Sequence, residues 1–190
     1  MFQTINPFSF STNRFIIRIV DYNDYLDYYE LCSSSIVTKY LTFEPYSSIK
    51  DAKRTITNMI RSFYIGECIN FSIVEKISKK VIGSISLTFF KNNNQCELGY
   101  LINEKFHHQH VMSEILPTFI QYAFNYYHPD VIFARVVKEN TYSIKLLEKN
   151  NFQYAYTLLN SVHMHNQLVN VLYYTYTYDT FLNSNVENND

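Results

Sequence analysis

The chain has 190 residues, which suits one domain with a sizeable core. Its formal net charge of -1 gives no basic surface for nucleic acid or for an anionic membrane. The three cysteines form no CxxC pair, so we expect neither a disulfide framework nor a zinc knuckle. The N-terminal segment lacks the pattern of a signal peptide, and no stretch approaches the roughly 20 apolar residues of a spanning helix. These features predict a cytoplasmic globular protein.

The first half of the chain predicts a strand, two helices and a three-stranded meander. Apolar spacing marks the strand at residues 14–20. Asp21 is placed to cap a helix over residues 22–32, and Ser48 with Asp51 gives the pattern of a capping box for the next helix. The meander strands are expected at residues 69–74, 81–89 and 95–102.

The second half predicts a strand–helix–strand crossover and two closing strands. A long helix begins near residue 110, and Pro117 inside it predicts a kink or a later start. The remaining elements are expected at residues 131–137 (strand), 140–150 (helix), 152–159 (strand) and 168–176 (strand). We interpret residues 12–178 as a single domain and residues 179–190 as a polar tail.

This element order predicts an α/β fold with a mixed, mostly antiparallel central sheet and flanking helices. The crossover makes the strands at residues 95–102 and 131–137 parallel neighbours. Ligands favour the crevice at the carboxyl ends of such strands. We therefore expect a binding site at the carboxyl ends of these two strands.

Four segments resemble the GNAT superfamily of N-acetyltransferases, and most closely its RimJ/RimL-type members. They are RFIIR (14–18), VIGSISL (81–87), ELGYLIN (97–103) and ENTYSIKLLEKNNF (139–152). The last segment has the family's Asn-x-x-Ser helix start at Asn140 and Ser143. It also has the Glu-Lys-x-Gly-Phe ending, with Asn151 in place of glycine. Asn tolerates the left-handed conformation that follows a helix.

The resemblance implies a GNAT fold, acetyl-CoA as co-substrate and no metal. The pantetheine arm would pair like an added strand with Tyr100, Leu101 and Ile102. The remaining cofactor-binding residues implied by the resemblance are His108, Gln109, His110, Val111, Met112, Ser113, Asn140 and Lys145.

The predicted pyrophosphate loop departs from the family pattern Gln/Arg-x-x-Gly-x-Gly/Ala. In that register the chain reads HHQHVM over residues 107–112, without the glycines that let backbone N–H groups approach phosphate. The imidazoles could turn outward or donate hydrogen bonds to phosphate. A metal site is the less favoured alternative, because it would need three or four convergent ligands and a strand-to-helix loop does not guarantee that convergence.

Two residues are candidates for catalysis. Glu97 is either an exposed strand residue or a general base that removes the proton of an ammonium acceptor. The resemblance implies the second role at this position for some members. Ser143 either satisfies the local backbone or, by the resemblance, protonates or hydrogen-bonds the leaving thiolate of CoA. Leu147 occupies the place where many GNAT enzymes have Tyr. Cys96 points away from the face of Glu97, so we expect direct attack without a covalent enzyme intermediate.

The resemblance gives three alternatives for the function. The first is acetyl transfer to a protein N-terminal amine, and the second is transfer to a small amine such as a polyamine or an aminoglycoside. The missing glycines motivate the third, a CoA-binding or protein-interaction module that has lost catalysis. No nucleic-acid or membrane partner is expected, and the sequence leaves open whether the chain is a monomer or a homodimer.

Overall fold

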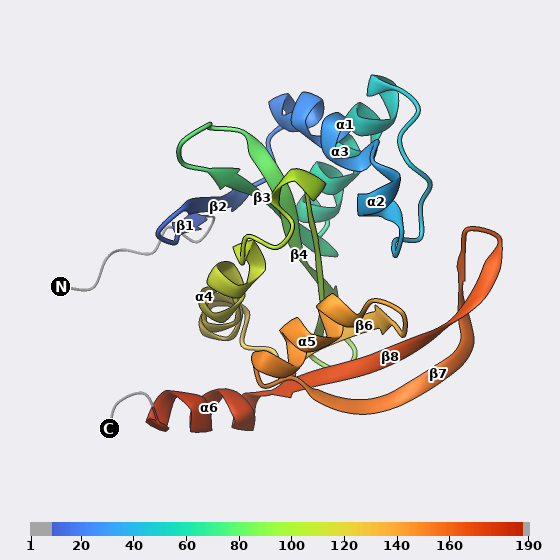
Figure 1. Cartoon of the computed structure of the whole chain (residues 1–190). Coiled ribbons are helices and arrows are strands. Elements are labelled where there is room, and N and C mark those ends of the chain that lie inside the picture. The colour runs from blue at the N-terminus through green and yellow to red at the C-terminus, as the bar shows by residue number, and fades with distance from the viewer. Residues whose placement is uncertain (1–8, 188–190) are drawn as a thin grey trace. The chain divides into compact units, whose positions relative to one another are not determined.

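The computed structural model describes residues 9–187, whose helices and strands are labelled in Figure 1. They divide into two compact units: unit 1 runs to Thr88 and includes Gly99–Val111, and unit 2 holds Phe89–Leu98 and the residues from Met112 onward. The strands hydrogen-bond in the order β1-β2-β3-β4-β5-β6-β8-β7, and β5 pairs with β6 in parallel. The predicted α/β fold with a mixed, mostly antiparallel sheet is confirmed.

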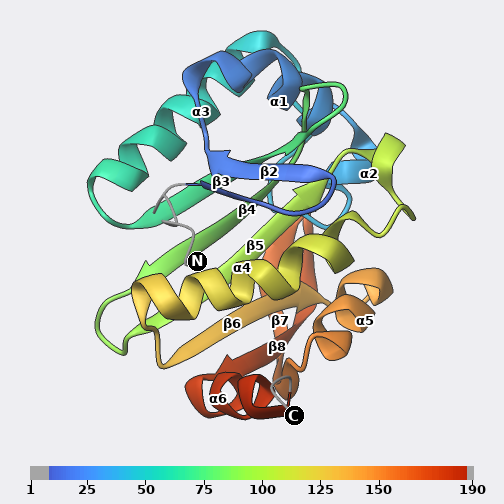
Figure 2. The ribbon, with the colours of Figure 1, turned by 90° about the vertical axis from the view of Figure 1, so that its left-hand side faces the viewer.

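Unit 1 contains the first strands and the helices that pack on them. Its elements are β1 (Ser9–Ser11), β2 (Phe15–Ile19), η1 (Tyr22–Asp24), α1 (Tyr25–Cys32), α2 (Ser35–Thr38), α3 (Ile49–Tyr64), β3 (Cys68–Glu75), most of β4 (Val81–Phe90), the end of β5 (Gln95–Ile102) and η2 (Glu104–Phe106). The strands β1 to β4 pair antiparallel in sequence order. The helices α1 and α3 lie side by side next to β3 (Figure 2). Tyr28 and Ile56, both fully buried, join these helices to the strands in one apolar cluster.

Both predicted helix starts in unit 1 are confirmed by their caps. Asp21 and Asp24 form a capping box at η1, and Ser48 and Asp51 form one at α3. The side chain of Ser34 caps the one-turn helix α2. The sequence does not predict α2 or β1, because elements this short give no periodic pattern.

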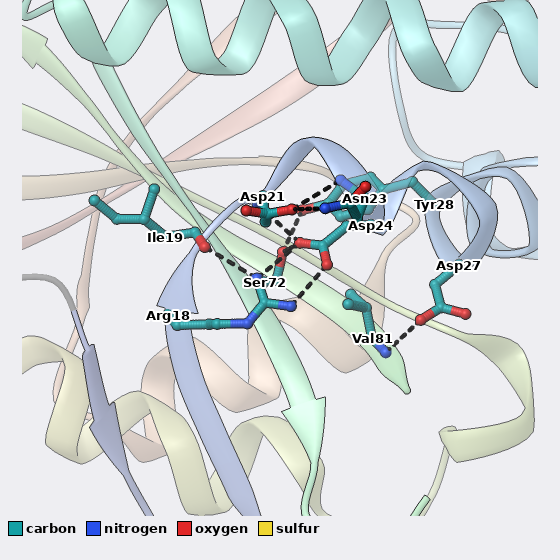
Figure 3. Close-up of polar contacts among 9 residues, drawn as sticks. All are labelled: Arg18, Ile19, Asp21, Asn23, Asp24, Asp27, Tyr28, Ser72 and Val81. Carbon is teal, nitrogen blue, oxygen red and sulfur yellow. Dashed lines mark hydrogen bonds and ion pairs between the residues drawn. The ribbon is translucent and has the colours of Figure 1, made fainter. Parts of the chain in front are cut away.

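A polar network is buried beneath the start of α1 (Figure 3). Arg18 Nη1 and Nη2 donate to the two carboxylate oxygens of Asp24 over 2.8 and 2.7 Å, and Asp24 is only 7% exposed. The Ser72 hydroxyl and the Asp21 N–H also donate to Asp24 Oδ2, over 2.7 and 3.0 Å. Burial alone would raise the pKa of Asp24, but the hydrogen bonds from Arg18, Asp21 and Ser72 outweigh burial and lower it. This carboxylate ties β2, β3 and η1 together.

Unit 2 combines the start of β5 with an aromatic core. Its other elements are α4 (Val111–Tyr127), β6 (Val131–Val137), α5 (Thr141–Lys149), β7 (Gln153–Met164), β8 (Gln167–Thr177) and α6 (Tyr178–Glu187). The strand β5 pairs with β6 in parallel, while β6 with β8 and β8 with β7 pair antiparallel. The strands β7 and β8 form a long, curved hairpin (Figure 1). The ring of Phe124 stacks on Phe181 at 4.7 Å and lies 5.6 Å from Tyr176.

Two predictions about unit 2 need correction. The segment predicted as a polar tail holds the helix α6, which is anchored by the buried Phe181. The long helix α4 begins at Val111 and continues through Pro117 to Tyr127, so the expected later start does not occur. Within residues 9–187, no helix combines the length and apolar character needed to cross a membrane.

Candidate functional site

The loop from β5 to α4, in unit 1, is held by several short contacts. The Asn103 N–H donates to Ile82 O on β4 over 2.8 Å, which anchors the start of the loop. His107 Nε2 lies 3.0 Å from Ile102 O, at hydrogen-bond distance. Arg14 Nη2 donates to Gln109 O over 3.0 Å. The loop is therefore fixed to β4, to β5 and to the residue before β2.

Two residues of this loop adopt the left-handed backbone conformation without being glycine. The φ angles of His108 and His110 are 60° and 57°, and both side chains are exposed. His110 occupies the first glycine position of the family pattern, and Val111 opens the following helix. His is one of the residue types enriched in this region of φ. The loop thus has a backbone shape that glycine favours, although no glycine is present.

The residues predicted to bind the pantetheine arm lie at the end of β5, also in unit 1. Tyr100, Leu101 and Ile102 are half-buried. A Cβ on Gly83 of β4 would lie 2.6 Å from the Leu101 carbonyl oxygen. Only glycine therefore permits β4 to approach so closely, and this approach fixes the position of the β5 backbone.

In unit 2, Glu97 forms a bidentate ion pair with Arg135. Arg135 Nε and Nη2 donate to the two carboxylate oxygens of Glu97, each over 2.7 Å. The side chains are 44% exposed for Arg135 and 18% exposed for Glu97. The hydrogen bond to Glu97 raises the pKa of Arg135 above its usual value. Glu97 and Phe133 form the last residue pair of the parallel ladder between β5 and β6, so the ion pair lies where that ladder ends.

Aromatic rings continue from this ion pair across the same face of the unit 2 strands. Phe133 and Tyr173 stack at 5.1 Å, and Tyr173 and Tyr156 stack at 4.7 Å. Arg135 and Tyr173 are register partners on β6 and β8. The guanidinium of Arg135 therefore has a flat, largely apolar surface beside it.

The helix α5 carries the other predicted catalytic residue. The Asn140 side chain accepts a hydrogen bond from the Ser143 N–H over 3.2 Å and so caps the helix. Lys145 is exposed, and Leu147 is fully buried. Asn151 follows the helix with a φ of 63°, which confirms the left-handed conformation expected there.

Cys96, the neighbour of Glu97 on β5, is buried and free. Burial raises the pKa of its thiol to about 12, so a reactive thiolate is scarce near neutral pH. In the part of the chain that the structure describes, no three His, Cys, Asp or Glu side chains are grouped to hold a metal.

The structure places the predicted residues in two sets. Tyr100 to Ile102 and His108 to Val111 belong to unit 1. The others, Glu97, Met112, Ser113, Asn140, Ser143 and Lys145, belong to unit 2. Sequence reasoning missed Arg135, although it is the only charged residue in the strand VIFARVV. A lone charge in a buried strand calls for a partner, and Glu97 is the only charged residue in the neighbouring strand β5.

Comparisons with known proteins agree with this fold. The family model described as acetyltransferase (GNAT) domain matches residues 14–153. An uncharacterized N-acetyltransferase p20 from Bacillus licheniformis is 31% identical over 144 residues, which cover 75% of this chain and 80% of that protein.

Two solved structures show the same fold at low identity. One, from Salmonella typhimurium, is described as an acetyltransferase that modifies the N-terminal serine of ribosomal protein L7/L12. It has a TM-score of 0.78 and 16% identity, covering 88% of this chain and 97% of that one. The other is spermidine N-acetyltransferase from Vibrio cholerae in complex with CoA and spermine, with a TM-score of 0.77 and 17% identity. It covers 89% of this chain and 98% of that one.

Proposed function

Because the chain belongs to the GNAT acetyltransferase family, and so is an acetyl-CoA-dependent N-acetyltransferase, we propose that its acceptor is the N-terminal amine of a protein or peptide. The main alternative is a polyamine, since proteins of both kinds share the fold. A polyamine carries several ammonium groups, and its recognition needs complementary negative charge. The strands β5 to β8 carry a single carboxylate, Glu97, and Arg135 neutralises it. This observation favours an acceptor with one reactive amine.

The experiment that tests this proposal is the release of CoA thiol from acetyl-CoA in the presence of defined amines. A lysine-free peptide with a free N-terminus is expected to support release. The same peptide with a formylated N-terminus is the control, and it should not. If spermidine supports the release of CoA thiol and the peptide does not, the proposed acceptor is wrong.

The resemblance assigns acetyl-CoA contacts to residues of each set. The backbone of Tyr100 to Ile102 would pair with the pantetheine arm, and the N–H groups from His108 to Ser113 would bind the pyrophosphate at the start of α4. The left-handed backbone at His108 and His110 supports this role, because it gives the loop the shape that the missing glycines would provide. Asn140 and Lys145 would contact the CoA arm from α5.

In the proposed reaction the acceptor nitrogen forms a bond with the acetyl carbonyl carbon, and the bond from that carbon to sulfur breaks. Glu97 takes the proton that the amine loses, directly or through water. Each carboxylate oxygen keeps a lone pair beyond its bond to Arg135. A backbone N–H between Leu98 and Tyr100 polarises the carbonyl. The sulfur leaves as a thiolate, which the Ser143 hydroxyl stabilises with a hydrogen bond. The second proton that the nitrogen loses reaches this thiolate through Ser143 or water, so Ser143 keeps a proton.

Replacing Ser143 by Ala should lower the maximal rate about tenfold, the size of one hydrogen bond formed in the transition state. Acetyl-CoA binding should stay nearly unchanged, because the thiolate exists only as the bond breaks. Steady-state kinetics and calorimetry measure the two effects separately. A variant that turns over normally but binds acetyl-CoA much more weakly would assign Ser143 to ground-state binding instead.

Replacing His110 by Gly should tighten acetyl-CoA binding about fivefold without loss of stability. The φ of 57° is free of strain for glycine, and the removal of Cβ lets the backbone approach phosphate. Calorimetric titration gives the affinity. The matched control is His110→Val, which should lower the free energy of unfolding by about 1 kcal/mol, since a β-branched residue is strained at this φ. Weaker binding by the Gly variant would show instead that the imidazole is itself a phosphate ligand.

A further inference from the structure

The four strands β5, β6, β7 and β8 carry only two Asp, Glu, Lys or Arg residues, namely Glu97 and Arg135. The two form a bidentate pair with both bonds at 2.7 Å. The bidentate geometry lets this partly exposed pair add to stability, but that role leaves part of the Arg135 guanidinium unused. Its place at the end of the β5–β6 ladder is where ligands of parallel strands bind. The pair is therefore a candidate for recognition.

Neither side chain uses its full hydrogen-bonding capacity. Arg135 donates to Glu97 through Nε and Nη2, and its Nη1 has no hydrogen-bond acceptor anywhere in residues 9–187. The guanidinium carries five N–H donors, and a carboxylate oxygen has about two acceptor sites. The Arg135 side chain is 44% exposed. The pair thus offers a cationic donor edge and an anionic acceptor edge next to each other.

The aromatic rings beside the pair strengthen this arrangement. Phe133 and Tyr173 lie almost parallel, with 16° between their planes, and Tyr173 and Tyr156 differ by 13°. On the β4 side, the ring of Phe90 lies 5.4 Å from Phe133. The buried Phe133 excludes water behind the pair, while the half-buried Tyr173 and the exposed Tyr156 provide a flat surface for the rest of a ligand. Electrostatic contacts in such surroundings are stronger than in bulk water.

We propose that Glu97 and Arg135 together select acceptors that carry an anionic group on the same residue as the reactive amine or on the next one. The amine hydrogen-bonds to Glu97, and the anionic group binds the Nη1 edge of Arg135 in a charge-assisted hydrogen bond. A peptide with Asp or Glu directly after its first residue offers this chemistry, and so does a free α-amino acid. The inference rests on the proposed function, because it specifies the acceptor of the same reaction.

The experiment compares acceptors that differ only in the anionic group. One arm uses two lysine-free peptides that begin with Ala-Glu and Ala-Gln, and the other arm uses alanine and alaninamide. In the arm that matches the acceptor, wild-type protein should prefer the acidic member about 10- to 100-fold in kcat/KM, the size of one charge-assisted hydrogen bond. A preference confined to the peptide arm identifies a peptide acceptor. A preference confined to the other arm identifies an amino acid, which supports the inference but overturns the proposed peptide acceptor.

Variants of Arg135 then assign the preference to this side chain. Arg135→Gln should bring the ratio of acidic to amide acceptor close to one, and Arg135→Lys should retain part of it through its charge. Both kcat/KM values in the ratio come from the same variant. A general loss of activity caused by an unpaired Glu97 lowers both values equally and does not change the ratio. The KM for acetyl-CoA should be unchanged in both variants, which separates acceptor recognition from cofactor binding.

The outcomes separate this inference from the proposed function. Equal kcat/KM values for the acidic and amide members in wild type would overturn the inference while the N-terminal acceptor stands. A preference that survives in Arg135→Gln would overturn it as well. Transfer to lysine side chains or spermidine, with none to any α-amine, would overturn the proposed function and the inference together.

Discussion

Replacing Glu97 by Gln is expected to lower turnover about 100- to 10,000-fold, the usual cost of losing a general base. The glutamine has nearly the same shape but accepts no proton from the amine. The loss should be greatest below the pKa of the acceptor amine, where nearly every acceptor arrives as an ammonium. Rates measured across pH for the variant and the wild type test this, and acetyl-CoA binding by calorimetry should be unchanged.

Two control variants identify the cause of that loss. Glu139→Gln changes an exposed carboxylate in the loop after β6, and it should behave like wild type. The double variant Glu97→Gln with Arg135→Gln removes both charges. If the single variant is slow only because Arg135 is left unpaired, the double variant recovers activity. An unchanged pH–rate profile in Glu97→Gln would mean that Glu97 has only a structural role.

Replacing Asp24 by Asn should lower the free energy of unfolding by about 3 kcal/mol, the low end of the cost of breaking a buried ion pair, because Asp24 is buried while Arg18 is 34% exposed. Asp24 accepts hydrogen bonds from Arg18, Ser72 and the Asp21 N–H. A neutral amide has only one acceptor oxygen, so it cannot accept all of these hydrogen bonds. Urea denaturation gives the value. The matched control is Arg54→Ala, which breaks the exposed pair with Asp51 and should cost at most about 1 kcal/mol.

The effect of Asp24 should also depend on pH. The folded-state pKa of Asp24 is lowered, so the ionised carboxylate stabilises the native state fully above the unfolded pKa of about 3.9. That contribution is lost as the pH falls through the folded pKa. The difference in unfolding free energy between wild type and Asp24→Asn should therefore shrink toward acid pH. A difference that stays constant down to acid pH would mean that the charge of Asp24 does not stabilise the fold.

The sequence predicts the parts of the fold that rest on local chemistry. The caps at Asp21, Ser48 and Asn140 follow from side chains that can satisfy free N–H groups at a helix start. The strand β6 is continuously apolar apart from Arg135, and its observed bounds, Val131–Val137, equal the predicted ones. The left-handed Asn151 follows from the small set of residues that tolerate this conformation.

Features that depend on tertiary partners are not visible in the sequence. The pairing of Glu97 with Arg135 joins residues 38 positions apart, and although the sequence predicts their strands as neighbours, only the structure gives the register that brings the two side chains together. The helix α6 is missed because its anchor is a tertiary contact of one buried aromatic, Phe181, with Phe124. The left-handed backbone of His108 and His110 is also unexpected, because the loop sequence lacks the glycines that mark this shape.

The most direct test of the proposed activity is to find which amine receives the acetyl group. Purified protein is incubated with acetyl-CoA and an equimolar mixture of three acceptors: a peptide with a free N-terminus and no lysine, an N-terminally blocked peptide with one lysine, and spermidine. Mass spectrometry of the products locates the modification. We expect acetylation of the free N-terminal amine alone, and none of it without acetyl-CoA. Acetylation only of the lysine or of spermidine, or of no acceptor at all, would contradict the proposed function.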